Sequence, residues 1–126
     1  MKVLQIIQSA YRCTIEEQDD PAVWIVHAMK GAGADLGVLL RGNAVNYAVR
    51  GQDASGLRFG ALEQTQPPAL ERDISGLMEK GVPIYAVAED TADRGLAPTG
   101  LIDGVELVPR ERVTDLLGRY DQVWHW

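Results

Sequence analysis

The chain has 126 residues, 46% of them hydrophobic and 24% charged, which predicts an ordinary globular fold with a single domain over residues 1–126. The net charge of −6 and the absence of a basic run argue against direct binding to nucleic acid. The single cysteine excludes an internal disulfide and fits a reducing cytoplasm. No apolar stretch approaches the roughly 20 residues that span a bilayer, so no membrane partner is expected.

The first part of the chain predicts a strand followed by a helix. Residues 3–7 (VLQII) are a mainly apolar run typical of a buried strand, and the run is too short for the core of a signal peptide. The helix has two candidate starts: Thr14 with Glu17 has capping-box spacing, and Asp20 precedes a proline that suits a first turn. The apolar residues over 22–29 predict a helix buried on more than one side, against the sheet and another subunit.

The middle of the chain predicts a second strand over residues 36–40, followed by a short helix over 44–50 that Asn43 can cap. Residues 51–66 hold glycines and polar residues with few apolar anchors. Such a connection is long for a compact domain, so we expect it to be either mobile or functional. Two prolines then precede a helix across residues 70–78, where apolar residues recur at helical spacing.

A third strand over residues 84–88 (IYAVA) is the most sharply defined element. It is apolar throughout, as in a strand covered on both faces, and it stops at the acid pair Glu89 and Asp90, where a short helical turn begins. Residues 105–108 and 122–126 predict two more strands with a helix between them. Strands that alternate with helices indicate a three-layer α/β/α fold with flavodoxin-like layering and a mostly parallel sheet of about five strands.

The carboxyl edge of this sheet is where we expect a site, because parallel strands bring the loops that follow them to one edge. Three loops should gather there: residues 9–14, 41–46 and 89–94. Helix starts in these loops offer backbone N–H groups that favour an anion or a thiolate. The alternative is that the polar residues only cap helices and pair with one another. The candidate ligand- or partner-binding residues are Arg12, Arg41, Asn43, Asn46, Glu89, Asp90 and Arg94.

Cys13 is the one candidate catalytic residue. Beside Arg12 and near a helix start, its thiol could have a lowered pKa and act as a nucleophile or carry sulfur. The other interpretation is a small, partly buried residue without chemistry. No histidine lies within a few residues of it to act as a base.

Other classes of site have little support. Cys13, His27 and His125 form no pair at metal-ligand spacing, so no metal or other cofactor is expected. No Gly-x-Ser-x-Gly motif indicates a hydrolase, and the glycines at 31–33 follow a helix rather than a strand, unlike a dinucleotide-binding loop. Tryptophans are typical of core and interface positions, and we expect contacts with other subunits at Trp24, Trp124 and Trp126.

Three segments resemble the DsrE/DsrF/DsrH family, called TusB, TusC and TusD in the transfer-RNA sulfur relay: VLLRGNAVNYAV (38–49), GVPIYAVAEDTADRGL (81–96) and YDQVWHW (120–126). The last two are most similar to the DsrH/TusB branch, which has an acid pair after this strand and ends in a tryptophan-containing strand. The resemblance spans nearly the whole chain. It implies a DsrE-like α/β/α domain, assembly into dimers, trimers or hexamers with itself or related subunits, and work in intracellular sulfur transfer.

The resemblance also implies that the family's sulfur-carrying residue is missing. In the DsrE/TusD branch a cysteine at the end of the third strand carries a persulfide; Val87 stands there, and Asp90 replaces a frequent second cysteine. Trp24 aligns with a helix-one cysteine of some DsrH members, and Cys13 lies in a different loop. Valine cannot accept sulfur, so we expect a non-catalytic binding or scaffolding subunit whose partners include a sulfur-carrier protein. The alternatives are a sulfur carrier that uses Cys13 and a protein that binds a small anionic ligand.

Overall fold

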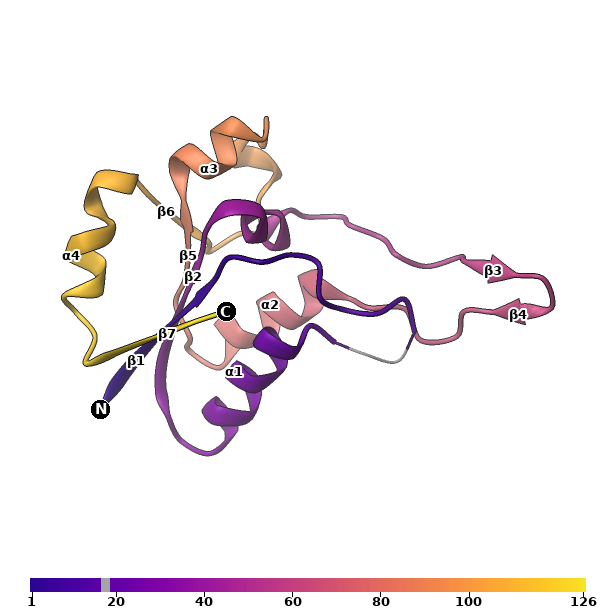
Figure 1. The fold of residues 1–126 in the computed structure, drawn as a ribbon, viewed down its shortest axis with the longest axis horizontal. Helices are drawn as coiled ribbons and strands as arrows, with labels where there is room; N and C mark the ends of the chain where they lie inside the picture. Colours follow the sequence, from indigo (N-terminus) through magenta and orange to yellow (C-terminus); the bar gives the residue numbers. More distant parts are fainter. Residues whose placement is uncertain (17–18) are drawn as a thin grey trace.

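The computed structural model describes residues 1–16 and 19–126, and a five-stranded sheet lies at its centre (Figure 1). Its strands are β1 (Lys2–Ile7), β2 (Asp35–Leu40), β5 (Ile84–Val87), β6 (Glu106–Val108) and β7 (Gln122–His125). They lie in the order β6-β5-β2-β1-β7, and every pairing between them is parallel. The predicted α/β fold with a parallel sheet of about five strands is confirmed.

Helices cover both faces of the sheet, which makes three layers. On one face lie α1 (Pro21–Gly31), α2 (Leu70–Glu79) and the 3-10 helix η1 (Gly42–Ala48), over the larger of two apolar cores. On the other face α4 (Val113–Leu117) packs Leu116 into a smaller core that includes Leu4 and Tyr85. None of the helices in the described part of the chain has the length and apolar character needed to cross a bilayer.

The burial of the central strands explains their continuous apolar runs. Five of the six residues in β1 and in β2 are buried, and all four residues of β5 are, because side chains on both faces meet a helical layer. Gln5 is the polar residue among the buried positions of β1. Its fully buried side-chain oxygen accepts a hydrogen bond from the indole N–H of Trp126 at 2.8 Å, which fixes the end of the chain against the core.

Helix α1 begins at the second of its two candidate starts. Oδ1 of Asp20 accepts hydrogen bonds from the backbone N–H groups of Ala22 (2.9 Å) and Val23 (3.1 Å), as an N-cap residue does. Glu17, which belongs to the other candidate, lies outside the described residues. Within the single chain α1 buries one side only, and Trp24 on its outer side is 57% exposed. Nothing in the described part of the chain therefore covers the outer side of α1, the second side that the sequence predicts to be buried.

Several predicted element boundaries differ from the structure, and two of the differences bear on the site. Helix η1 begins at Gly42 with Arg41 as the N-cap residue and no side-chain cap, and it ends at Ala48. Asn43 therefore does not cap a helix over 44–50. Strand β5 ends at Val87, because Ala88 is already the first residue of the helix α3 (Ala88–Asp93).

The long connection after η1 forms a projecting hairpin. Strands β3 (Arg58–Phe59) and β4 (Leu62–Glu63) pair in antiparallel fashion and extend away from the sheet, to the right in Figure 1. Gly60 has φ of +63° in the two-residue turn between them, a conformation that glycine adopts without strain. We call residues 57–64 the arm. The remaining short helices are η2 (Pro98–Gly100) and η3 (Arg110–Arg112).

Candidate functional site

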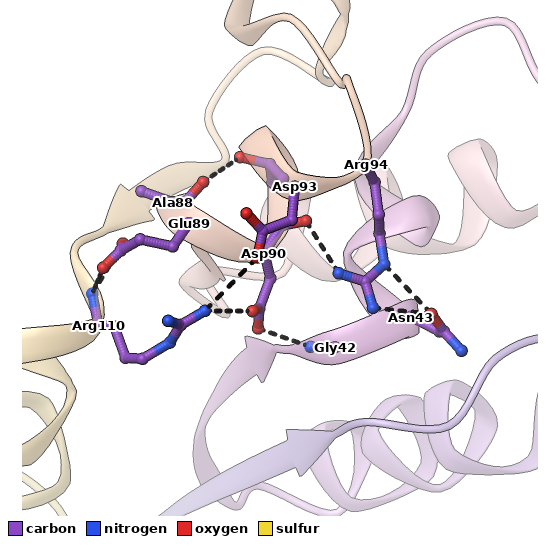
Figure 2. Close-up of polar contacts among 9 residues, drawn as sticks. Gly42, Asn43, Ala88, Glu89, Asp90, Asp93, Arg94 and Arg110 are labelled. Carbon is purple, nitrogen blue, oxygen red and sulfur yellow. Dashed lines mark hydrogen bonds and ion pairs between the residues drawn. The ribbon is translucent and has the colours of Figure 1, made fainter.

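The loops that follow β2, β5 and β6 meet at the carboxyl edge of the sheet. Strand β5 lies between the other two, so the residues after each strand become neighbours. Figure 2 shows the polar side chains and backbone groups that come together there. We call this set the rim cluster; its members are Gly42, Asn43, Glu89, Asp90, Arg94 and Arg110.

Asp90 is at the centre of the rim cluster. Its Oδ2 accepts a hydrogen bond from the backbone N–H of Gly42 at 2.7 Å, and its Oδ1 accepts one from the guanidinium of Arg110 at 2.8 Å. The side chain is only 15% exposed. Burial acts to raise the pKa of Asp90, but the Gly42 bond and the charge of Arg110 outweigh it and hold the pKa below its usual value. At neutral pH the carboxylate is therefore charged and already bound to both partners.

The other charged residues of the rim cluster are also paired within it. Both carboxylate oxygens of Glu89 lie 2.9 Å from the backbone nitrogen of Arg110, which donates to them. The guanidinium of Arg94 donates to Oδ1 of Asn43 at 2.8 and 3.2 Å and to the backbone oxygen of Asp90 at 3.1 Å. These bonds join α3 to η1 on one side and to the residues after β6 on the other.

The rim cluster uses its own carboxylate where a ligand anion would otherwise bind. The backbone N–H of Gly42 at the start of η1 is a donor suited to an anion, and Asp90 occupies it. A second anion would meet the negative charge of this carboxylate and that of Glu89. Val87, which ends β5, is 3% exposed and offers no group that reacts. The geometry favours a structural junction over a reactive centre.

Residues 9–14 contact the far end of η1 rather than the rim cluster. The backbone N–H of Arg12 donates to the hydroxyl of Tyr47 at 3.2 Å, and this hydroxyl donates to Oδ2 of Asp20 at 2.5 Å. Within residues 1–16 and 19–126, no hydrogen bond or ion pair joins 9–14 to 89–94. Two of the three predicted loops therefore come together, and the third belongs to a separate buried network.

Cys13 lies in an acidic rather than a basic environment. Burial raises the pKa of its thiol, and the negative charges of Asp20 and Asp19 raise it further. The guanidinium of Arg12 is exposed and has no ion-pair partner among the residues described. The interpretation in which Arg12 and a helix start lower the pKa of Cys13 is therefore not supported, because burial and the carboxylates that the fold brings near the thiol raise that pKa.

We expect this environment to make Cys13 a slow nucleophile. The rise in the rate of alkylation by iodoacetamide should occur at higher pH for the folded protein than for the same protein in denaturant, since the thiolate is the reacting form. Intact-mass measurements over a range of about pH 6 to 10 give both profiles. An apparent pKa in the folded protein below that of the unfolded chain would contradict the structure.

The remaining predicted binding residues have local contacts. The backbone N–H of Arg41 donates to the carbonyl of Ile7 at 3.0 Å, and its half-buried side chain has no ion-pair partner in the described chain. Nδ2 of Asn46 donates to the carbonyl of Asn43 at 2.8 Å within η1. The side chain of Asn46 therefore contacts the rim cluster only through the backbone of Asn43.

The three tryptophans differ in how much of each side chain is buried within the single chain. Trp126 is half-buried, bonded to Gln5 and packed against the larger core, so it already anchors the C-terminal strand. Trp24 on α1 and Trp124 on β7 are 57% and 39% exposed. These two remain the tryptophans whose surface is free to contact another subunit.

Sequence reasoning missed Arg110 and the buried pair of Tyr47 and Asp20. Arg110 stands two residues after β6, and its link to Asp90 follows only if β6 is known to lie beside β5. The signal was present, because a proline and an arginine follow a predicted parallel strand. Asp20 was predicted as a cap, but nothing local indicated that its second oxygen binds Tyr47.

Two cavities lie near the arm rather than at the rim cluster. One of about 570 Å³ is lined by residues that include Asp53, Thr65 and Arg72. The other, of about 300 Å³, is lined by the apolar side chains of Ile15, Leu57, Phe59 and Leu62 and by polar neighbours. In the described part of the chain, no group of three or more His, Cys, Asp or Glu residues is arranged to hold a metal ion.

Comparison with solved structures shows the same fold in other proteins. The crystal structure of the ychN protein from E. coli matches with a TM-score of 0.75 and 20% identity over 99% of this chain and 98% of that one. MTH1491, a protein of unknown function from Methanobacterium thermoautotrophicum, matches with a TM-score of 0.61 and 14% identity over 99% and 97%. At these identities the likeness establishes the fold alone. No protein-family model and no curated protein sequence matches the chain.

Proposed function

We propose that this chain is a DsrE/DsrH-like protein of intracellular sulfur transfer in the cytoplasm, and that it acts as a binding or scaffolding subunit without a persulfide cysteine. The sequence resemblance suggests the pathway. One observation carries the non-catalytic role: the end of β5, where the family resemblance expects the sulfur carrier, holds buried Val87 and then Asp90 bound to Gly42 and Arg110.

The presence of Val87 and Asp90, where the family resemblance expects cysteines, supports a role in binding. A carboxylate cannot form a sulfur–sulfur bond, so Asp90 cannot take over the role of a second cysteine. The internal pairing of Asp90 with Arg110 also ties α3 to the residues after β6, which favours a fixed shape at this edge. A rigid edge without a thiol suits a subunit that positions other proteins.

Two exposed aromatic surfaces suit contact with related subunits. Trp24 projects from α1, and Trp124 lies on β7, an edge strand whose four residues are all exposed. Large exposed aromatic side chains are enriched at the energetic centres of protein interfaces. An exposed edge strand is a further feature that natural proteins usually cover.

The two alternatives receive less support. A sulfur carrier through Cys13 needs an accessible thiolate, whereas burial and nearby carboxylates raise the pKa of this thiol. A small anionic ligand at the rim would have to compete with Asp90 for the N–H of Gly42. We therefore rank both below the scaffolding role.

Recovery of an affinity-tagged chain from its own cells tests the proposal. We expect it to elute in complexes well above the 13.8 kDa of one chain by light scattering, with proteins that carry reactive cysteines identified by mass spectrometry. Trp24→Ala should weaken the complex at least about tenfold. The matched control is Tyr11→Ala, an exposed aromatic residue (52%) in the loop after β1 rather than on α1. A strict monomer that recovers no partner would contradict the proposal.

A further inference from the structure

A small pocket of about 180 Å³ lies between α1 and α2, which pack beside each other (Figure 1). The residues that line it come from α1, from α2 and from the position before the cap of α1: Asp19, Val23, Trp24, His27 and Asp73. We call these five residues the α1–α2 pocket. Val23 is fully buried, whereas Trp24 is 57% exposed and Asp19 is also exposed. The pocket therefore combines an apolar side chain, an exposed aromatic one and two carboxylates.

The carboxylate of Asp73 is incompletely paired within the chain. The side chain is 13% exposed, and its buried Oδ2 accepts no hydrogen bond from any described residue. Oδ1 lies 3.6 Å from Nε of Arg72, whose side chain is 75% exposed. Buried polar atoms are nearly always hydrogen-bonded, so an unbonded one indicates a missing partner. The χ2 torsion of aspartate is broad, which lets either oxygen turn toward the pocket.

The charges around Asp73 indicate that the missing partner is a cation. Burial raises the pKa of Asp73, and the negative charge of Asp19 raises it further. The nearby guanidinium of Arg72 acts in the opposite direction without cancelling this rise. Lys80 is not available, because its Nζ is bound to Nδ1 of His27 at 3.1 Å. The net charge of −6 on the whole chain adds to the attraction for a cation.

We propose that the α1–α2 pocket takes an arginine side chain of a partner protein, whose guanidinium lies against Trp24 and pairs with Asp73 and Asp19. A planar guanidinium stacks on an aromatic ring and forms two parallel hydrogen bonds with a carboxylate. It is also more weakly hydrated than the ammonium of lysine, so it loses less on entering a half-buried site. The apolar side chain of Val23 suits the methylene groups of the same arginine.

The size of the pocket favours a side chain over a whole small molecule. Pockets for small molecules hold roughly 300–1,000 Å³, so about 180 Å³ accommodates one end group. Asp19 also lines the cavity of about 570 Å³, so the two spaces adjoin at this residue. The larger cavity leaves room for the backbone that carries the arginine. The inference rests on the proposed binding role for the source of the arginine alone.

Titration of the ¹⁵N-labelled chain with a capped peptide, acetyl-Gly-Arg-Gly-amide, tests the pocket by NMR. We expect a saturable shift of the indole N–H of Trp24, assigned with Trp24→Phe, and of the backbone N–H of His27. Binding should weaken as NaCl is raised, because salt screens the charges. The same peptide with citrulline, which has the shape of arginine without its charge, should give no saturable shift. The lysine peptide should bind more weakly than the arginine peptide.

Single substitutions assign the contacts, with the backbone N–H of His27 as the reporter. Asp73→Asn keeps the shape of the side chain and should weaken binding at least about tenfold, because it removes the less exposed charge. Asp19→Asn and Trp24→Leu should each weaken it about two- to fivefold, as exposed ion pairs and cation–π contacts do. Asp19 is exposed, so its variant reports on the pocket even where Asp73→Asn disturbs the fold. The matched control, Asp103→Asn, removes the same charge from a side chain that is 97% exposed and should change the affinity less than about twofold.

Three results would overturn the inference. Equal binding of the citrulline peptide would show that the charge is not recognised. Equal losses with Asp73→Asn and Asp103→Asn would show a general attraction to an acidic chain. Tighter binding of free L-arginine than of the capped peptide would replace the partner side chain with a small molecule. Recovery of partner complexes from cells, which tests the proposed function, does not depend on any of these results.

Discussion

Replacing Asp20 with alanine is expected to lower the free energy of unfolding by about 3 kcal/mol. The fully buried carboxylate caps α1 through the N–H groups of Ala22 and Val23 and accepts the hydroxyl proton of Tyr47. Loss of an N-cap costs about 1 kcal/mol, and a buried hydroxyl left without its acceptor costs about 1–3 kcal/mol. Urea denaturation followed by circular dichroism measures the change in the free energy of unfolding. In a thermal melt, the same substitution should lower Tm by about 10 °C.

The matched variants separate the two functions of this carboxylate. Tyr47→Phe removes only the hydroxyl, so the double mutant Asp20→Ala/Tyr47→Phe should lose less than the sum of the single losses. Asp20→Asn retains an oxygen that caps the helix and should cost about 1 kcal/mol. It also removes a negative charge near Cys13, so alkylation of the thiol should become faster at neutral pH. An Asp20→Ala protein within 1 kcal/mol of wild type would contradict the network.

Replacing Asp90 with alanine should cost about 2 kcal/mol. The change leaves the N–H of Gly42 without an acceptor and removes the charge-assisted bond from Arg110, and bonds of this kind contribute about 1.5–3 kcal/mol each before relaxation. Asp93 supplies the matched control, since its carboxylate lies 4.0 Å from the same guanidinium and is 70% exposed. Asp93→Ala should stay within about 0.5 kcal/mol of wild type. Equal effects of the two substitutions would contradict the central place of Asp90.

The lowered pKa of Asp90 also predicts how stability depends on pH. The folded-state pKa lies below the ordinary value of 3.8, so the unfolded chain binds the proton more tightly. The contribution of Asp90 is therefore fully present above about pH 5 and is lost as the pH falls below 4 towards the folded-state pKa. Asp90→Asn should flatten this part of the stability profile. An unchanged slope between wild type and variant would show that Asp90 is not the group responsible.

The order of strands and helices could be predicted because the elements that matter are local in the chain. A parallel strand buried on both faces needs an unbroken apolar run, and residues 36–40 and 84–88 supply one each. The cap at Asp20 was readable for the same reason, since a cap and its helix adjoin. The hairpin in the arm was not, because the Gly60–Ala61 turn is flanked by only two paired residues on each side.

The rim cluster could be predicted only in outline. Glu89, Asp90 and Arg94 were correctly placed beside η1, since the carboxyl ends of neighbouring parallel strands share an edge. The bonds themselves join residues far apart in the chain: Asp90 is 48 residues from Gly42 and 20 from Arg110. Which residue binds a carboxylate across such separations in sequence depends on the order of the strands in the sheet. A single sequence does not reveal that order.

Cys13 shows the same limit in electrostatics. Its neighbour in sequence is Arg12, and this suggested a lowered pKa. Its neighbours in space are Asp20 and Asp19, and with burial they raise it. Burial and the charges near a thiol are set by packing, so adjacent residues alone left both interpretations of Cys13 open.

The proposed role makes one claim above all, that the folded chain does not itself carry sulfur. Incubation of the folded protein with a low-molecular-weight persulfide, followed by intact-mass measurement, tests it most directly. We predict no adduct of about 32 Da on the folded chain and an adduct on Cys13 once the chain is unfolded. A stoichiometric adduct on the folded wild-type protein that is absent from Cys13→Ser would instead identify the chain as a sulfur carrier.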